Sequence, residues 1–240
     1  MQGDPALLFR AANSRIRTLS AFLKHAGAAY LKETITGILS SLDMSLNYDY
    51  TDAANHSNFR AAVKSAVEVI QASLVRLPRF IIVILAALYE KTEEKFPEHG
   101  TTAVAGMFVL RQLMSTLSMP EAAGLGIEVP PPLKDVPKEL SKVLQFVYSR
   151  AEVQLEQLLP LAPFIHQQAQ TASRALCQEI IQIAKEPLAP SKLFKGLGSS
   201  KEVRNIAKAK LQESLLDSAS ALEDEILQCL SASSLGFEQE

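Results

Sequence analysis

The chain has 240 residues, of which 48% are hydrophobic and 21% are charged, and its 24 lysines and arginines nearly balance its 26 aspartates and glutamates. This composition is typical of a globular protein with a substantial core, and the formal net charge of −2 argues against a nucleic-acid partner bound through bulk positive charge. The two cysteines, Cys177 and Cys229, favour neither a disulfide framework nor a zinc site, which fits a cytoplasmic protein.

The beginning of the sequence shows neither a secretory signal nor a myristoylation pattern. The most apolar stretch, residues 80–88, is shorter than the roughly 20 residues that cross a bilayer. We therefore interpret this stretch as a buried helix and expect the chain to be soluble.

Apolar residues recur at helical spacing along most of the chain, so the sequence predicts an all-α fold. Two apolar stripes, over residues 19–26 and 30–42, are separated at Gly27, and a polar loop is expected next. A third helix covers residues 59–74, with a break at Leu77 because the residue before a proline disfavours the helical conformation. The buried apolar helix follows, from residue 80 to about residue 95.

Segments rich in proline and glycine divide the second half of the chain. Thr101 or Thr102 is expected to cap a helix over residues 104–119, and a rigid connector over residues 124–132 precedes a helix over 140–153 and another over 163–184. We assign residues 1–185 to a helical core, 186–200 to a linker, and 201–240 to a long C-terminal helix and tail.

No motif of a self-contained active site is visible. The four histidines lack helical metal-binding spacing, glycine-rich phosphate loops and nucleophile elbows do not occur, and Glu93 and Glu94 are interpreted as a solvated helix face. Basic residues gather between Arg10 and Lys32. This charge indicates either an ordinary solvated helix face or a surface for an anionic partner or a phosphate.

Several short segments stand out between about residue 6 and about residue 168: Leu8-Phe9-Arg10, Phe22-Leu23-Lys24, Tyr30-Leu31, residues 73–78, Phe96-Pro97, residues 106–111, residues 141–145 and residues 159–165. In this order they resemble segments of the Ras GTPase-activating protein (Ras-GAP) domain family, with Leu8-Phe9-Arg10 as the finger-loop tripeptide and residues 106–111 as the counterpart of the family's FLR signature. One tripeptide is a weak signal, but several in order with compatible spacing are much stronger. The resemblance implies an all-α Ras-GAP-like fold.

The resemblance also implies chemistry in another protein's active site. Arg10 corresponds to the arginine finger, which stabilises negative charge on the transferred phosphoryl group of a GTP-bound Ras-type small GTPase; a planar guanidinium that binds two phosphate oxygens suits this role. Arg111 corresponds to the arginine that supports the finger loop. The chain needs no cofactor, since GTP and magnesium belong to the GTPase. The partner-binding residues implied are Leu8, Phe9, Asn13, Lys24, Leu110, Lys142 and Gln145.

The chain also departs from the family pattern. The family usually has Asn-Ser or Asn-Thr two and three places after the finger, whereas here Ala11 and Ala12 intervene and Asn13-Ser14 lie one place late. Nine residues precede Arg10 where the family has several helices. Our leading hypothesis is a GTPase activator that its partner recruits to the membrane; the alternative is a non-catalytic module that binds or scaffolds a small GTPase. A third interpretation is a helical scaffold that self-associates through residues 201–232. Simpler interpretations also stay open: Arg10 is a solvated arginine, Arg111 is a semi-buried arginine, and Gln145 is an amide on the helix surface.

Overall fold

A computed structural model describes residues 14–186, and every regular element in that range is a helix, which confirms the all-α prediction. The α-helices are α1 (Ser14–Ala26), α2 (Ala28–Ser40), α3 (His56–Ser73), α4 (Arg79–Lys95), α5 (Gly100–Val104), α6 (Ser115–Ser118), α7 (Val136–Ser149) and α8 (Ala162–Lys185). A π-helical segment, η4 (Ala105–Met114), joins α5 to α6. Short 3₁₀ turns are η2 (Ala53–Asn55), η3 (Leu74–Arg76), η5 (Glu121–Ala123), η6 (Pro131–Leu133) and η7 (Glu156–Leu161).

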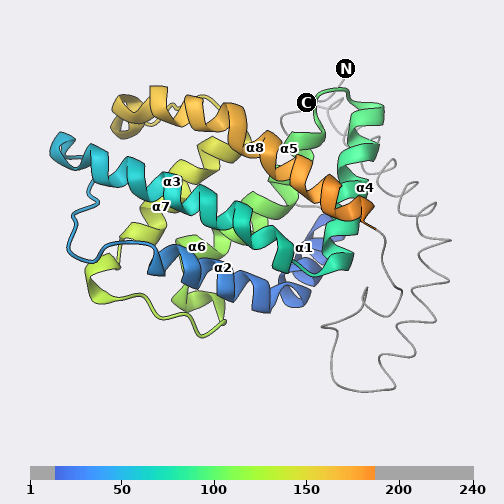
Figure 1. The fold of residues 1–240 in the computed structure, drawn as a ribbon, viewed down its shortest axis with the longest axis horizontal. Helices are drawn as coiled ribbons and strands as arrows, with labels where there is room; N and C mark the ends of the chain where they lie inside the picture. The colour runs from blue at the N-terminus through green and yellow to red at the C-terminus, as the bar shows by residue number, and fades with distance from the viewer. Residues whose placement is uncertain (1–13, 187–240) are drawn as a thin grey trace, which may run out of the picture.

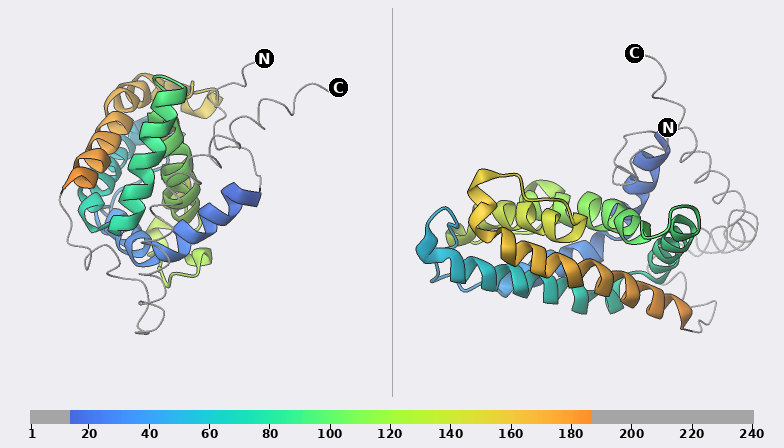
Figure 2. Two further views of the ribbon diagram at one scale, coloured as in Figure 1. Left: turned by 90° about the vertical axis from the view of Figure 1, so that its right-hand side faces the viewer. Right: turned by 90° about the horizontal axis from the view of Figure 1, so that it is seen from above.

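The helices form an elongated body (Figure 1). The continuous stretch of α5, η4 and α6 runs through its middle, α7 packs along this stretch, and α8 packs on both α7 and α4. Helix α1 contacts η4 and α2, and its N-terminal end projects away from the body (Figure 2). The predicted C-terminal helix over 201–240, and the linker beyond its first residue, lie outside the described residues.

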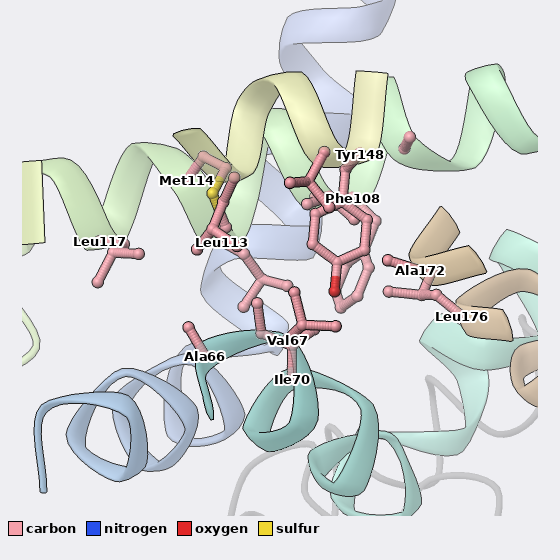
Figure 3. Packing of buried hydrophobic residues seen from close by; sticks show 14 of the residues in the cluster. Ala66, Val67, Ile70, Phe108, Leu113, Met114, Leu117, Tyr148, Ala172 and Leu176 are labelled. Atoms are coloured by element: carbon pink, nitrogen blue, oxygen red, sulfur yellow. The ribbon is translucent and has the colours of Figure 1, made fainter. Parts of the chain in front are cut away.

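The core lies where η4, α3, α7 and α8 meet, and Figure 3 shows its side chains converging from these four elements. Phe108 of η4 lies beside Tyr148 of α7, and the Tyr30 ring of α2 approaches the Phe108 ring with centroids 6.0 Å apart. Each large apolar side chain buried here contributes about 1.5–3 kcal/mol to stability. Aliphatic side chains fill the space around these rings, as expected for a chain without tryptophan.

The predicted breaks at Gly27 and Leu77 are confirmed. Gly27 separates α1 from α2, and a Cβ atom there would lie 2.8 Å from the carbonyl oxygen of Leu23, so only glycine fits this close approach. Leu77 is extended, with ψ of 131°, and α4 begins two residues later because Pro78 fixes the backbone at its start.

Arg79, the first residue of α4, ties that helix to the end of α8. Its Nη2 donates to the carbonyl oxygens of Ala184 at 2.9 Å and Glu186 at 2.7 Å, and its side chain is 12% exposed. A cation at the N-terminus of α4 is unfavourable for that helix, but here the charge sits on the carbonyl end of α8, where the helix dipole favours it. Arg79 therefore stabilises the last turn of α8.

The prediction that Thr101 or Thr102 caps the helix that includes η4 is wrong. Neither Thr101 nor Thr102 precedes the helix, because α5 begins at Gly100. Glu93 caps it instead: its Oε1 accepts from the backbone N–H of Gly100 and its Oε2 from that of Glu98, both at 2.8 Å. Glu93 is therefore not the solvated residue we expected, because the chain folds back after α4 and brings this carboxylate to the free N–H groups of the next helix.

The expected helix over residues 140–153 is also too long at its C-terminal end. α7 ends at Ser149 because Arg150 adopts the left-handed conformation, with φ of 56°. The chain turns there, and Val153 is buried in the connection to α8 rather than in α7.

No single helix between residues 14 and 186 combines the length and the hydropathy of a membrane span. Residues 53–76 and 79–95 reach that threshold only as a pair, and they are bent by 111° at the break between them.

Candidate functional site

A surface pocket of about 380 Å³ lies between η4 and α7. Within residues 14–186, its wall includes three residues of η4, three of α7 and one residue just beyond the end of α7: Gly106, Leu110, Arg111, Gln145, Phe146, Ser149 and Ala151. Apolar side chains and a glycine line much of it, while a guanidinium, a carboxamide and a hydroxyl supply polar groups. Such a mixed lining suits a partner group with an apolar body and an anionic or amide end.

The π-helical geometry of η4 explains why Gly106 and Arg111 share this wall. In a π-helix the backbone hydrogen bonds join residues five apart, so residues at that spacing lie on one face. Gly106 and Arg111 are five apart, and Leu110 is their neighbour on the same face. Gly106 contributes only backbone atoms to this wall.

α7 contributes the opposite wall through residues spaced at one helical turn. Gln145 and Ser149 are four apart, and Phe146 lies beside them on the same face. Buried residues such as Leu144 and Tyr148 hold the other face of α7 against the core. The left-handed turn at Arg150 then brings Ala151 back to close the end of the pocket.

The structure brings together three of the residues predicted from the resemblance. Leu110 and Arg111 are half-buried, Gln145 is exposed, and all three line the pocket. The carbonyl oxygen of Arg111 also accepts a hydrogen bond of 2.6 Å from Ser115 Oγ.

Lys142 of α7 does not line the pocket. Its Nζ donates to both carboxylate oxygens of Glu139, at 2.7 and 3.0 Å. Tyr50, from the connection between α2 and α3, donates its hydroxyl to Glu139 Oε2 at 2.8 Å. Lys142 thus belongs to a partly buried cluster that ties this connection to α7.

Lys24 is exposed in the last turn of α1 and does not line the pocket either. A lysine at the C-terminal end of a helix interacts favourably with the helix dipole. Leu8, Phe9, Arg10 and Asn13 lie outside the described residues.

α1, the helix that follows these residues, is joined to η4 by Gln112. The Gln112 side chain is 1% exposed, and its Nε2 donates to the Ser20 carbonyl oxygen at 3.1 Å and to Ser20 Oγ at 2.9 Å. Gln112 follows Arg111 directly, so neighbouring residues of η4 reach two different structures: Arg111 reaches the pocket and Gln112 reaches α1.

Five residues of the pocket wall and its attachment to α1 were not predicted from the sequence: Gly106, Gln112, Phe146, Ser149 and Ala151. The helical spacing of Ser149 from Gln145 was a signal in the sequence, whereas the spacing of Gly106 from Arg111 becomes informative only for a π-helix. Within residues 14–186, no group of three or more histidine, cysteine, aspartate or glutamate side chains could hold a metal ion.

Comparison of the sequence with models of known protein families and with curated proteins finds no match.

Proposed function

We propose that this chain binds a Ras-type small GTPase in its GTP-bound form through the pocket between η4 and α7, and that it accelerates GTP hydrolysis with Arg10 as an arginine finger. One observation carries the proposal. Leu110, Arg111 and Gln145 come from two separate segments that each resemble a Ras-GAP signature, and they line one pocket.

The two arginines have different parts in this proposal. Arg10 enters the nucleotide site of the GTPase and stabilises the negative charge that develops on the transferred phosphoryl group, a contribution worth about 10³–10⁵ in rate for arginine fingers in general. Arg111 stays in the wall of the pocket, where its half-buried side chain supports the loop that carries Arg10. Arginine suits both parts because its planar guanidinium keeps its charge and donates several hydrogen bonds in fixed directions.

A second function is a non-catalytic module that binds or scaffolds the GTPase. It is favoured by the presence of the pocket on η4 and α7 of the helical body, since a surface there can bind a partner whether or not a finger accelerates hydrolysis. The shift of Asn13-Ser14 by one place, behind Ala11 and Ala12, points the same way.

Single-turnover GTP hydrolysis by a panel of small GTPases, with increasing amounts of the full chain, tests the proposal. We expect acceleration with at least one GTPase, and a loss of about 10³-fold or more for Arg10→Ala at saturating concentration. If the wild type never exceeds the intrinsic rate of any GTPase, the catalytic proposal is wrong.

Binding is tested separately with a GTPase loaded with a non-hydrolysable GTP analogue or with GDP. Ala151→Trp fills the pocket and is expected to weaken binding of the GTP form by about tenfold or more, which corresponds to about 1.4 kcal/mol or more. Its matched control is Ala87→Trp, which places the same side chain at an exposed position of α4. Binding of the GTP form without acceleration would favour the non-catalytic function, and equal binding by both variants would exclude the pocket as the docking site.

A further inference from the structure

One partly buried polar contact joins α1 to the helical body. Gln112 donates from its Nε2 to the carbonyl and the hydroxyl oxygens of Ser20, at 3.1 and 2.9 Å. Both acceptors belong to one residue in the middle of α1, and the donor lies on η4 beside a residue of the pocket wall. The contact therefore links the orientation of α1 to the segment that carries Arg111.

Apolar side chains of α1 also contact the helical body. Ile16 and Leu23 are buried, Leu19 packs beside them, and the Phe22 ring lies 5.9 Å from the Phe80 ring of α4. Apolar contact depends on area and has little directionality, so it permits a helix to rotate or slide while it stays attached. A hydrogen bond weakens steeply with distance and angle. The pair of hydrogen bonds from Gln112 thus selects one rotation and one axial position of α1.

Gln112 leaves part of its own side chain unpaired. Its Oε1 is buried and has no hydrogen-bond partner, although its Nε2 has two. A buried acceptor without a hydrogen-bond partner is unfavourable, and a leucine at this position would have no polar atom to bury. Packing and stability alone therefore give little reason for an amide here, whereas a directional contact with α1 gives one.

We propose that Gln112 is a positioning residue for the arginine finger. Ser14, where α1 begins, follows Arg10 by four residues, a distance along the chain that spans at most about 14 Å. When Gln112 fixes α1, it fixes one end of the short segment that carries Arg10 relative to η4, on which Arg111 lies. The catalytic part of this inference rests on the proposed function.

The test compares Gln112→Leu with the wild-type full chain in single-turnover GTP hydrolysis. We expect the rate at saturating concentration to fall about tenfold or more, because a catalytic group displaced by about 1 Å loses much of its effect. The concentration that gives half of the maximal rate should change by less than about twofold, because the pocket is intact. A variant that had merely lost its fold would change both values and would also melt at a lower temperature.

The matched control is Thr116→Val. Thr116 lies on α6, in the same continuous helical stretch; it is also buried, and its Oγ1 also has no partner. This variant removes a buried unpaired oxygen without touching α1, and we expect it to retain the wild-type rate. If Gln112→Leu also retains the wild-type rate, or if Thr116→Val loses as much, the proposal is overturned.

A distance measurement tests the positioning without any GTPase. Spin labels at Ala21→Cys on α1 and Ala87→Cys on α4, both exposed, report the orientation of α1 in a Cys229→Ser background. Cys177 stays unlabelled because it is buried. We expect Gln112→Leu to broaden the distance distribution and Thr116→Val to leave it unchanged. An unchanged distribution for Gln112→Leu would overturn the positioning role even if the wild type proved inactive, whereas an inactive wild type with a broadened distribution would reject only the catalytic function.

Discussion

Tyr50 ties the connection between α2 and α3 to α7, and this contact makes stability sensitive to alkaline pH. The Tyr50 side chain is 4% exposed, and its hydroxyl donates to Glu139 Oε2 at 2.8 Å. Burial, followed by the hydrogen bond to Glu139 and the negative charges of Glu139 and Asp49, raises the pKa of Tyr50 to about 12. The folded protein therefore favours the protonated phenol more strongly than the unfolded chain does.

The size of the effect follows from the two pKa values. An unfolded tyrosine has a pKa of about 10, so the stabilisation by protonated Tyr50 is fully present below about pH 10 and is lost as pH rises through about 12. A difference of about two pKa units corresponds to about 2.7 kcal/mol in total. Between about pH 8 and about pH 11, roughly half of this amount, about 1.4 kcal/mol, should be lost.

Urea unfolding of wild type and Tyr50→Phe at these two pH values measures this loss. The wild type should lose about 1.4 kcal/mol more than Tyr50→Phe, because phenylalanine has no proton to release. Burial also raises the pKa values of the other four tyrosines, but these are common to both proteins and cancel in the comparison. Equal losses in the two proteins would refute the assignment of a raised pKa to Tyr50.

Three further substitutions test contacts elsewhere in the described helices. Gly27→Ala should lower the free energy of unfolding in urea by about 1–3 kcal/mol, because the new Cβ lies 2.8 Å from a backbone carbonyl oxygen. In the control Gly37→Ala the new Cβ lies 3.3 Å from a side-chain methyl group, and stability should stay within about 1 kcal/mol of wild type. Equal losses of stability in the two variants would contradict this. Arg79→Met should cost about 1–3 kcal/mol because two hydrogen bonds to the last carbonyls of α8 disappear, and an unchanged urea midpoint would show that they contribute nothing. Glu139→Gln removes the carboxylate that pairs with Lys142 and should raise affinity for a GTP-loaded GTPase about threefold at low salt; unchanged affinity would exclude Lys142 from the interface.

Local sequence signals were sufficient to predict the helical body. Apolar spacing gave α2, α3, α4 and α8 with errors of a few residues at their ends, and Pro78 and Gly27 marked breaks for steric reasons that hold in any fold. Two boundaries depended on less common geometry. Glu93 caps α5 across a turn in which Glu98 has a φ of 71°, and Arg150 ends α7 in the left-handed region without a glycine.

The pocket could be predicted only in part, because its composition depends on the π-helical register of η4. In an α-helix, Gly106 and Arg111 would lie about 140° apart around the axis and would face different neighbours. In the π-helix they share a face, and Gln112 turns toward α1 instead. The resemblance identified Arg111 and Gln145, but the residues that complete the wall follow from backbone geometry that apolar spacing does not reveal.

The attachment of α1 bears directly on the choice between an activator and a scaffold. A module that only grips its partner through the pocket gains nothing from a fixed rotation of α1, and an apolar contact would attach that helix well enough. An arginine finger stabilises charge effectively only when its position is set before the reaction, since ordering it during the reaction consumes free energy. Gln112 makes its directional contact with Ser20 although its own Oε1 is buried and unpaired. Such a contact is more useful to an activator than to a scaffold. If Gln112→Leu binds the GTP form as the wild type does and hydrolysis alone slows, the contact serves catalysis.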